Sequence, residues 1–225
     1  MRICWFANFR GNALPEAALD PLAVHLADTP GVGDVLIHTP ASTHDPYLDD
    51  GAPPSLALQL YFDDIAALEA ALAPDGHLQR LASPALLPGV TQATQQAMLA
   101  RAFPVPDPVF RTPPGSLPCT YLVSYEGQAE DLNAWLDYYL RSHPVIMARF
   151  PAIREIEICT RIDWIGFVPL TPVHHMQRNK VVFDDQAGLT AALNSPVRHE
   201  MRDDFKHFPP FTGPNTHFPM HTRTV

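Results

Sequence analysis

The chain of 225 residues has few groups that would suit a polyanionic partner or a cross-linked scaffold. Lysine and arginine total only 15 against 24 aspartate and glutamate residues, and the basic residues form no cluster. Because nucleic acids and anionic membranes attract clustered cations, the net charge of −9 argues against both as partners. Cys4, Cys119 and Cys159 are an odd number of cysteines without CxxC spacing, so neither a disulfide framework nor a zinc knuckle is expected.

Long apolar runs and phosphate-binding motifs are also missing. No stretch approaches the roughly 20 apolar residues that a membrane-spanning helix needs. The start, MRICWFANFR, has neither the apolar region nor the cleavage site of a signal peptide, so none is expected. With no disulfide framework expected, a reducing cytoplasm is the simplest expected location. A glycine-rich phosphate loop, a GxSxG elbow and the kinase motifs are absent, which argues against nucleotide and acyl-serine chemistry.

Proline, by contrast, is abundant, with 25 residues, and six of these lie within residues 104–118. Proline removes backbone donors and disfavours helix in the residue before it, so this stretch predicts a stiff, extended linker. We place the linker at 106–118, between a first unit at 1–105 and a second unit at 119–225.

Two segments repeat at an offset of 121 residues. VVFDDQAGLTAAL at 181–193 matches LYFDDIAALEAAL at 60–72 in eight of thirteen positions, and PAIREIEICT at 151–160 lies over PGVGDVLIHT at 30–39 in the same register. One register shared by two separate segments indicates that a unit was duplicated. In each FDD corner we expect the Phe to pack and the Asp pair to begin a helix, where carboxylates suit the positive helix end.

Each half follows a βαββαβ pattern. The second half predicts strands in CTYLVSYEG, FPAIREIEICTRI, HHMQRNKVVFDD and NTHFPMHTRTV, with helices at 128–143 and, as one stretch, 186–208. The first half predicts strands at 2–9, 30–39 and 55–64, helices at 16–28 and 65–73, and another helix near 91–102. We therefore expect an α+β fold of tandem repeats, in which helices cover one sheet face and the other repeat covers the second.

Four stretches of the second half, YYLRSHPVIMARFPAIREIEI, VVFDD, LNSPVRHEMRDDFKHF and FTGPNTHFPMH, together resemble the EthD-type members of the dimeric α+β barrel superfamily. The resemblance implies ferredoxin-like units whose sheets form a barrel, so that one chain supplies what other members obtain by dimerising. It also implies activities known in the superfamily: cofactor-free isomerases, lyases, decarboxylases and oxygenases of small aromatic or lactone compounds, with more distant members that bind haem.

His143 is the first candidate catalytic residue. Trp135, Tyr139 and His143 are spaced by four residues on one predicted helix, and Pro144 is expected to stop or bend that helix. An imidazole in an apolar wall can exchange a proton near neutral pH, and the family resemblance implies that it faces the cavity. The alternative is a histidine that caps the helix C-terminus. The register aligns His143 with Leu22, which predicts that only the second repeat carries a working site.

The second strand of this repeat alternates, with Glu155, Glu157 and Cys159 on one face. The matching positions of the first repeat are Asp34, Leu36 and His38. This face is either solvated or lines a polar cavity of a closed barrel, where an acid would suit proton transfer beside a histidine.

Neighbouring His174 and His175 point to opposite faces of a strand, and His175 shares its face with Gln177 and Asn179. We therefore assign His175 to the polar cluster. The stretch RHEMRDDFKH suggests metal ligands, but His199 and His207 lie about 12 Å apart along a helix, too far for one ion. No metal site is predicted.

The apolar connection 161–173, which contains Trp164, either roofs a cavity or packs against a partner. Our leading hypothesis is a cofactor-independent lyase, isomerase or decarboxylase of a small aromatic or lactone-like catabolite. His143, His175 and Glu157 are its expected catalytic residues, and the expected substrate contacts are Trp135, Tyr139, Trp164, Cys159 and Tyr125. The alternatives are a haem-binding oxidoreductase or dehydratase and a non-catalytic ligand-binding or assembly module. A homodimer is compatible with the family.

Overall fold

The computed structural model describes residues 2–225. The first half contains β1 (Arg2–Gly11), α1 (Glu16–Ala27), β2 (Val32–Pro40), β3 (Leu56–Phe62), α2 (Ile65–Ala71), the 3₁₀ helix η1 (His77–Ala82) and β4 (Val90–Phe103). The second half contains β5 (Cys119–Tyr125), α3 (Leu132–Met147), β6 (Ile153–Arg161), β7 (Thr171–Pro172), β8 (Gln177–Phe183), α4 (Gln186–Leu193), α5 (Pro196–Phe205) and β9 (Asn215–Thr224).

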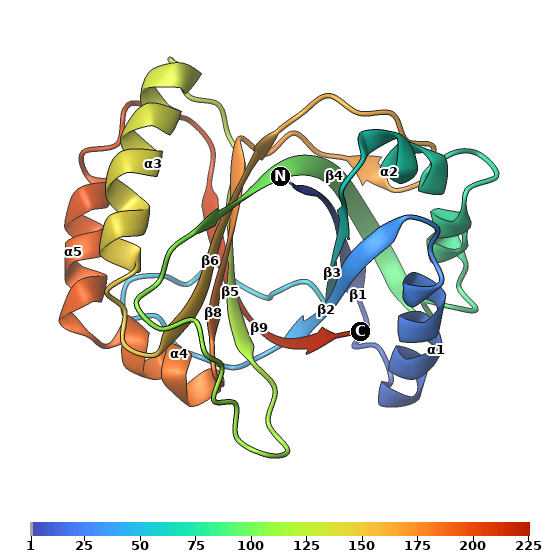
Figure 1. The fold of residues 1–225 in the computed structure, drawn as a ribbon, viewed down its shortest axis with the longest axis horizontal. Coiled ribbons are helices and arrows are strands. Elements are labelled where there is room, and N and C mark those ends of the chain that lie inside the picture. Colours follow the sequence, from blue (N-terminus) through green and yellow to red (C-terminus); the bar gives the residue numbers. More distant parts are fainter. Residues whose placement is uncertain (1) are drawn as a thin grey trace.

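Eight strands close into one antiparallel barrel (Figure 1). Their order is β1-β3-β2-β9-β5-β8-β6-β4, and β4 returns to pair with β1. The repeats therefore meet at two seams, β2 with β9 and β4 with β6. The expected α+β fold of tandem ferredoxin-like repeats is confirmed, while the domain division at residues 106–118 stays a prediction. No helix in residues 2–225 has the length and apolarity needed to cross a membrane.

The helix expected near 91–102 is wrong, because this segment is strand β4. Its alanines and glutamines favour a helix locally, but β4 supplies the strand that joins β1 to β6 and closes the barrel. Tertiary pairing therefore overrides local propensity. The single helix expected at 186–208 is also wrong: α4 ends before Asn194, and Pro196 starts α5.

The repeated FDD corners have the predicted structure. Phe62 and Phe183 are fully buried. Asp64 caps α2 by accepting from the Ala66 backbone N–H at 3.0 Å, and Asp185 caps α4 by accepting from Gly188 at 2.8 Å. The 121-residue register therefore repeats a capping interaction as well as a sequence.

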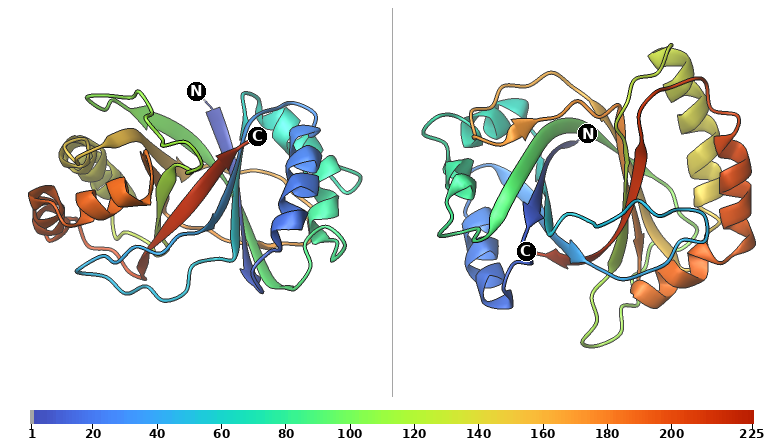
Figure 2. Two further views of the ribbon diagram at one scale, coloured as in Figure 1. Left: turned by 90° about the horizontal axis from the view of Figure 1, so that it is seen from below. Right: turned by 180° about the vertical axis from the view of Figure 1, so that it is seen from behind.

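The helices cover only the outside of the barrel (Figure 2). One apolar cluster lies between the first-repeat sheet and α1 and α2, and a second lies between the second-repeat sheet and α3, α4 and α5. The lumen contains a smaller cluster that includes Cys4, Phe6, Met98 and Cys159. Successive side chains along each strand thus lie alternately under the helices and in the lumen.

Two equivalent loops cross between the repeats, as Figures 1 and 2 show. The loop at 41–55 leaves the first repeat and reaches the second, where Asp45 accepts from Arg198 of α5. The connection at 162–176 crosses the other way, and the Phe167 N–H donates to the Leu72 carbonyl at 2.8 Å. Each repeat therefore covers part of its neighbour.

A left-handed backbone position also repeats at the 121-residue offset. Gly31 has a φ of 76°, and its counterpart Ala152 has a φ of 57°. This conformation crowds the Cβ of an L-residue against the following carbonyl, and glycine has no Cβ. The second repeat therefore holds strain that the first repeat avoids.

We expect Ala152→Gly to raise the free energy of unfolding by up to about 1 kcal/mol, because it relieves that strain. The matched change Gly31→Ala should lower it, since a Cβ there would lie 2.8 Å from the Ala67 Cβ. Urea unfolding of both variants checks this. A loss of stability for Ala152→Gly similar to that for Gly31→Ala would contradict it.

Candidate active site

His143 lies inside α3 and not at its end. Asp131 starts the helix by accepting from the Ala134 N–H at 2.9 Å. The helix continues through Pro144 to Met147, so of the two expectations for Pro144, a stop or a bend, the stop is wrong. The alternative of a C-terminal cap is also wrong, because His143 lies one turn before the helix end. The imidazole is turned toward α5 instead.

The His143 ring is hydrogen-bonded to Asp204 of α5. The two atoms Nδ1 and Oδ2 are 2.6 Å apart, and the side chains are only 7% and 8% exposed. Asp204 also accepts from the Tyr138 hydroxyl at 2.9 Å. These contacts hold the carboxylate and the imidazole in one orientation.

The environment favours a neutral imidazole beside an ionised carboxylate. Burial lowers the pKa of His143 below its ordinary value, although the bond to Asp204 acts in the opposite direction. Burial would raise the pKa of Asp204, but hydrogen bonds from His143 and Tyr138 outweigh it and leave that pKa below its ordinary value. With Nδ1–H donating to Asp204, Nε2 carries the free lone pair, as a general base requires.

The His143 ring lines a cavity of about 50 Å³ between the outer face of β5 and β8 and the helices α3, α4 and α5. The walls are mainly apolar and aromatic, and they include Tyr125, Tyr139, Met147 and Phe150. A second space of about 30 Å³ shares Tyr125 and His143 with the first and extends to Leu48. The two spaces together form the candidate active site.

Residues of the crossing loop complete the polar side of this site. Asp45 is buried, and it accepts from Arg198 Nε at 3.0 Å and from the Tyr121 hydroxyl at 2.9 Å. Asp50 lies 3.0 Å from His217 Nδ1, and hydrogen bonds from His217 outweigh burial to leave the pKa of Asp50 below its ordinary value. The first repeat thus supplies two carboxylates that hold Arg198 and His217 of the cavity wall.

The expected site residues divide among several places. His143, Tyr139 and Tyr125 are brought together in the cavity wall. Trp135 stacks on Tyr139 with ring centres 5.0 Å apart, one layer behind the wall. The remaining expected residues, Glu157, Cys159, His175 and Trp164, lie elsewhere.

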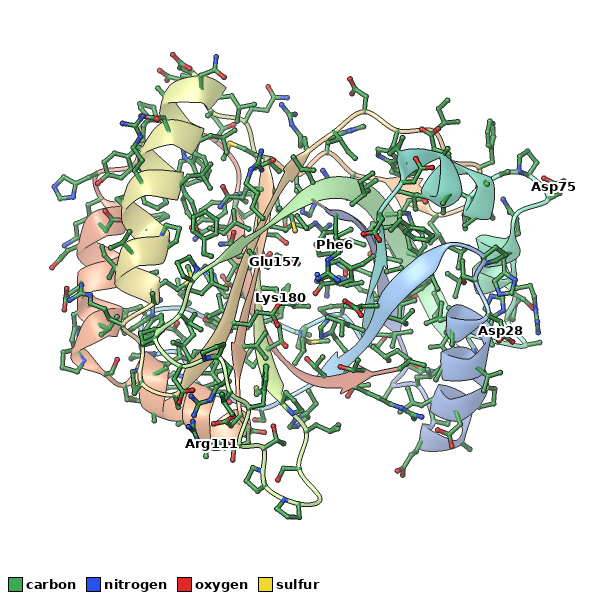
Figure 3. All side chains as sticks on the ribbon, viewed as in Figure 1. Phe6, Asp28, Asp75, Arg111, Glu157 and Lys180 are labelled. Atoms are coloured by element: carbon green, nitrogen blue, oxygen red, sulfur yellow. The ribbon has the colours of Figure 1, made fainter. Side chains whose placement is uncertain are left out.

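Glu157 points into the barrel lumen, as Figure 3 shows. Cys159 belongs to the lumen cluster, so both residues lie on the opposite face of the sheet from His143. Glu157 is 2% exposed and accepts from the Tyr61 hydroxyl at 2.6 Å, and Lys180 Nζ lies 3.9 Å away. The alternative of a solvated face is therefore wrong for Glu157 and Cys159. A role beside His143 is equally excluded, because the sheet lies between them.

His175 and Trp164 are separated from His143 as well. His175 lines a cavity at one mouth of the barrel, and burial lowers its pKa to about 3. Trp164 packs against the first-repeat core, because the connection 162–176 crosses to that repeat. Strand alternation and loop crossing are the physical reasons why one shared pocket does not form.

In residues 2–225, no group of three or more His, Cys, Asp or Glu side chains is arranged to hold a metal ion. His199 hydrogen-bonds to the Tyr47 hydroxyl, and His207 Nδ1 lies 2.9 Å from the Asp203 carbonyl oxygen. These two histidines therefore have structural partners.

Comparisons with known proteins identify the fold. No protein-family model matches the sequence, and no curated protein matches it. An anthrone oxidase-like protein superposes with a TM-score of 0.67 at 13% identity, over 99% of this chain and 93% of that one. A putative monooxygenase from Lactobacillus acidophilus NCFM gives 0.56 at 10% identity, over 100% and 95%.

A mutant chlorite dismutase from Candidatus Nitrospira defluvii gives a TM-score of 0.50 at 12% identity, over 97% of this chain and 91% of that one. At these identities the likeness shows the fold alone. The chain shares the α+β barrel fold of these proteins, and its barrel closes within one polypeptide.

We expect Asp204→Ala to lower the free energy of unfolding by about 2–4 kcal/mol, because it leaves the buried His143 ring and the partly buried Tyr138 hydroxyl without an acceptor. The adjacent Asp203→Ala is the matched control, since Asp203 is exposed and pairs with Lys206; it should leave the free energy of unfolding almost unchanged. Urea unfolding measures both, and equal effects would contradict the pairing.

Proposed function

We propose that this protein is an enzyme that removes a proton from a small aromatic substrate, with His143 as the general base and Asp204 as its positioning residue. The observation that carries the proposal is the buried pair of Nδ1 and Oδ2 at 2.6 Å, which leaves Nε2 free beside a cavity. Such positioned proton transfer contributes roughly 10²–10⁴-fold to a rate.

The shape and chemistry of the walls support an aromatic substrate. The faces and edges of the Tyr125, Tyr139 and Phe150 rings would pack against an aromatic substrate. Arg198 and His217 also line the cavity and would orient a polar substituent of that substrate. The joined spaces of about 50 and 30 Å³ are smaller than a typical ligand pocket of roughly 300–1,000 Å³. We therefore propose that the loop at 41–55 moves outward when substrate enters.

An oxygenation is the reaction that we favour after proton removal. The superposition with an anthrone oxidase-like protein and a monooxygenase supports this choice. His143 would take one proton from an activated CH₂ carbon, and the carbanion would reduce dioxygen and form a C–O bond. The resulting hydroperoxide would lose the second C–H proton and its outer oxygen as water, leaving a carbonyl group.

The same base would also serve a lyase, isomerase or decarboxylase of an EthD-type protein, which is the second candidate. The two candidates share His143 and differ in the co-substrate. Dioxygen uptake during turnover supports the first, and turnover under strict anaerobiosis supports the second. Tight binding of the aromatic compound without conversion would favour a non-catalytic binding module.

His143 has the chemistry of a haem ligand, but the cavity beside it has no room for a haem macrocycle. A histidine with Nδ1 bonded to a carboxylate and Nε2 free resembles a ligand with its usual supporting partner. A haem macrocycle, however, would displace side chains that are packed between the helices and the sheet, among them Met147, Phe183 and Leu189. The residues present therefore do not fit haem at His143.

With anthrone as the probe substrate, we expect His143→Gln to lower kcat/KM by at least about 100-fold. Glutamine retains a donor for Asp204 but provides no base, so the melting temperature should change little. His207→Gln, at an exposed histidine, is the matched control and should keep full activity. Retained activity in the His143 variant would contradict the proposal.

We also expect kcat/KM to rise with pH along a limb below about pH 6.5, because burial lowers the pKa of His143 and the neutral form is the active one. Stopped-flow or steady-state rates across pH 4–8 measure this limb. A limb centred above pH 7 would contradict a base with a lowered pKa.

Adding haem to the purified protein should give no Soret band that depends on His143. Absorption spectra of the wild type and the His143→Gln variant, each titrated with haem, make the test. If the wild type gains a Soret band and the variant does not, haem does fit at His143, and the haem-binding alternative is favoured.

A further inference from the structure

Arg178 is a buried cation without a counter-ion. Its side chain projects from β8 into the lumen, is 4% exposed, and lies over the Phe6 ring at 4.9 Å. Within residues 2–225, its Nε has no hydrogen-bond partner, and its guanidinium forms no ion pair. The other buried basic residues differ: Arg154, Lys180 and Arg198 each pair with a carboxylate.

A buried guanidinium without an ion pair lowers the stability of the folded protein unless an anion binds to it. Moving an unpaired charge out of water costs several kcal/mol, and the cost is recovered only when a partner with good geometry is present. Burial lowers the pKa of Arg178 to about 10, so the side chain remains charged at neutral pH. A bound anion would therefore be stabilised by a charge that the fold leaves unpaired.

A cavity of about 270 Å³ lies beside this charge at one mouth of the barrel. Asn8, Ser124 and Thr216 supply polar groups, and His175 contributes an Nδ1 that is buried and without a partner in the described chain. Glu126 also lines the cavity, and its negative charge partly offsets the effect of burial on the pKa of Arg178. Its carboxylate accepts from the Thr216 hydroxyl at 3.1 Å and forms no ion pair with Arg178.

Apolar side chains form another part of the wall, among them Phe6, Leu122, Val173 and Phe218. Figure 3 shows Phe6 directed into the barrel, facing the strands that carry Glu157 and Lys180. A ligand that suits this wall has an apolar body as well as an anionic head. Exposed Arg10 stands at the rim and would attract an anion toward the opening.

We propose that this lumen cavity binds a small aromatic monocarboxylate, with the carboxylate paired to Arg178 and the ring against Phe6, Leu122 and Phe218. The planar guanidinium matches a carboxylate in a two-bond geometry. A single buried cation beside Glu126 suits one negative charge better than the two of phosphate. The site is separate from His143, because the β5 and β8 sheet lies between them.

Isothermal titration calorimetry with benzoate, benzamide and inorganic phosphate tests the proposal at constant ionic strength. Benzoate should bind saturably with one site per chain. Benzamide has the same shape without the charge and should bind at least about tenfold more weakly. Phosphate should give no saturable heat.

Arg178→Met keeps the side-chain length and removes the charge, so it should weaken benzoate binding by about 100-fold. Without ligand, this variant should melt at the same temperature as the wild type or higher, because an unpaired buried charge is gone. Arg161→Met, at an exposed arginine outside the cavity, is the matched control and should bind like the wild type. His143→Gln should also bind like the wild type, which separates this site from the proposed active site.

Equal benzoate affinity in Arg178→Met and the wild type would overturn the proposal. So would equal affinities of the wild type for benzoate and benzamide, a comparison that holds even if the Arg178 variant does not fold. Saturable phosphate binding that displaces benzoate would overturn the aromatic carboxylate assignment in favour of a general anion site.

Discussion

Closure of the sheet is the constraint on which the rest of the structure depends. Once β4 pairs with both β1 and β6, and β2 pairs with β9, no repeat keeps a free sheet edge at the seams. Every side chain of the eight barrel strands must then face either the helices or the lumen. The protein therefore has two separate interiors, one between the sheet and the helices and one in the lumen. A polar side chain of a barrel strand interacts only with groups in the same interior.

This division explains why the histidines and carboxylates form separate groups of hydrogen-bonded residues. His143 and Asp204 belong to the outer interior, where aromatic walls and burial keep the imidazole neutral. Glu157 belongs to the lumen, where Tyr61 and Lys180 occupy it. The crossing loops link the repeats in another way, since Asp45 of the first repeat is needed to neutralise Arg198 of the second. The candidate site therefore includes contacts from both repeats.

Much of the fold could be predicted from the sequence, because a 121-residue register and matched FDD corners report local structure directly. The segment 90–103 could not, since its strand state depends on partners in both repeats. The position of His143 beside aromatic side chains follows from the amphipathic spacing of its helix. Asp204 lies in RHEMRDDFKH, and no local spacing relates it to a partner 61 residues away on another helix. Asp45 and Asp50 lie in the other half of the chain, where no sequence pattern relates them to the site.

The proposed role of His143 requires a neutral imidazole with a proton on Nδ1 and a free Nε2. Long-range ¹H–¹⁵N NMR of the histidine rings tests it most directly, with the His143 signals assigned from the His143→Gln variant. At pH 7 we expect one pyrrole-type nitrogen, Nδ1, and one pyridine-type nitrogen, Nε2. A spectrum with both nitrogens protonated, or with the proton on Nε2, would contradict the account.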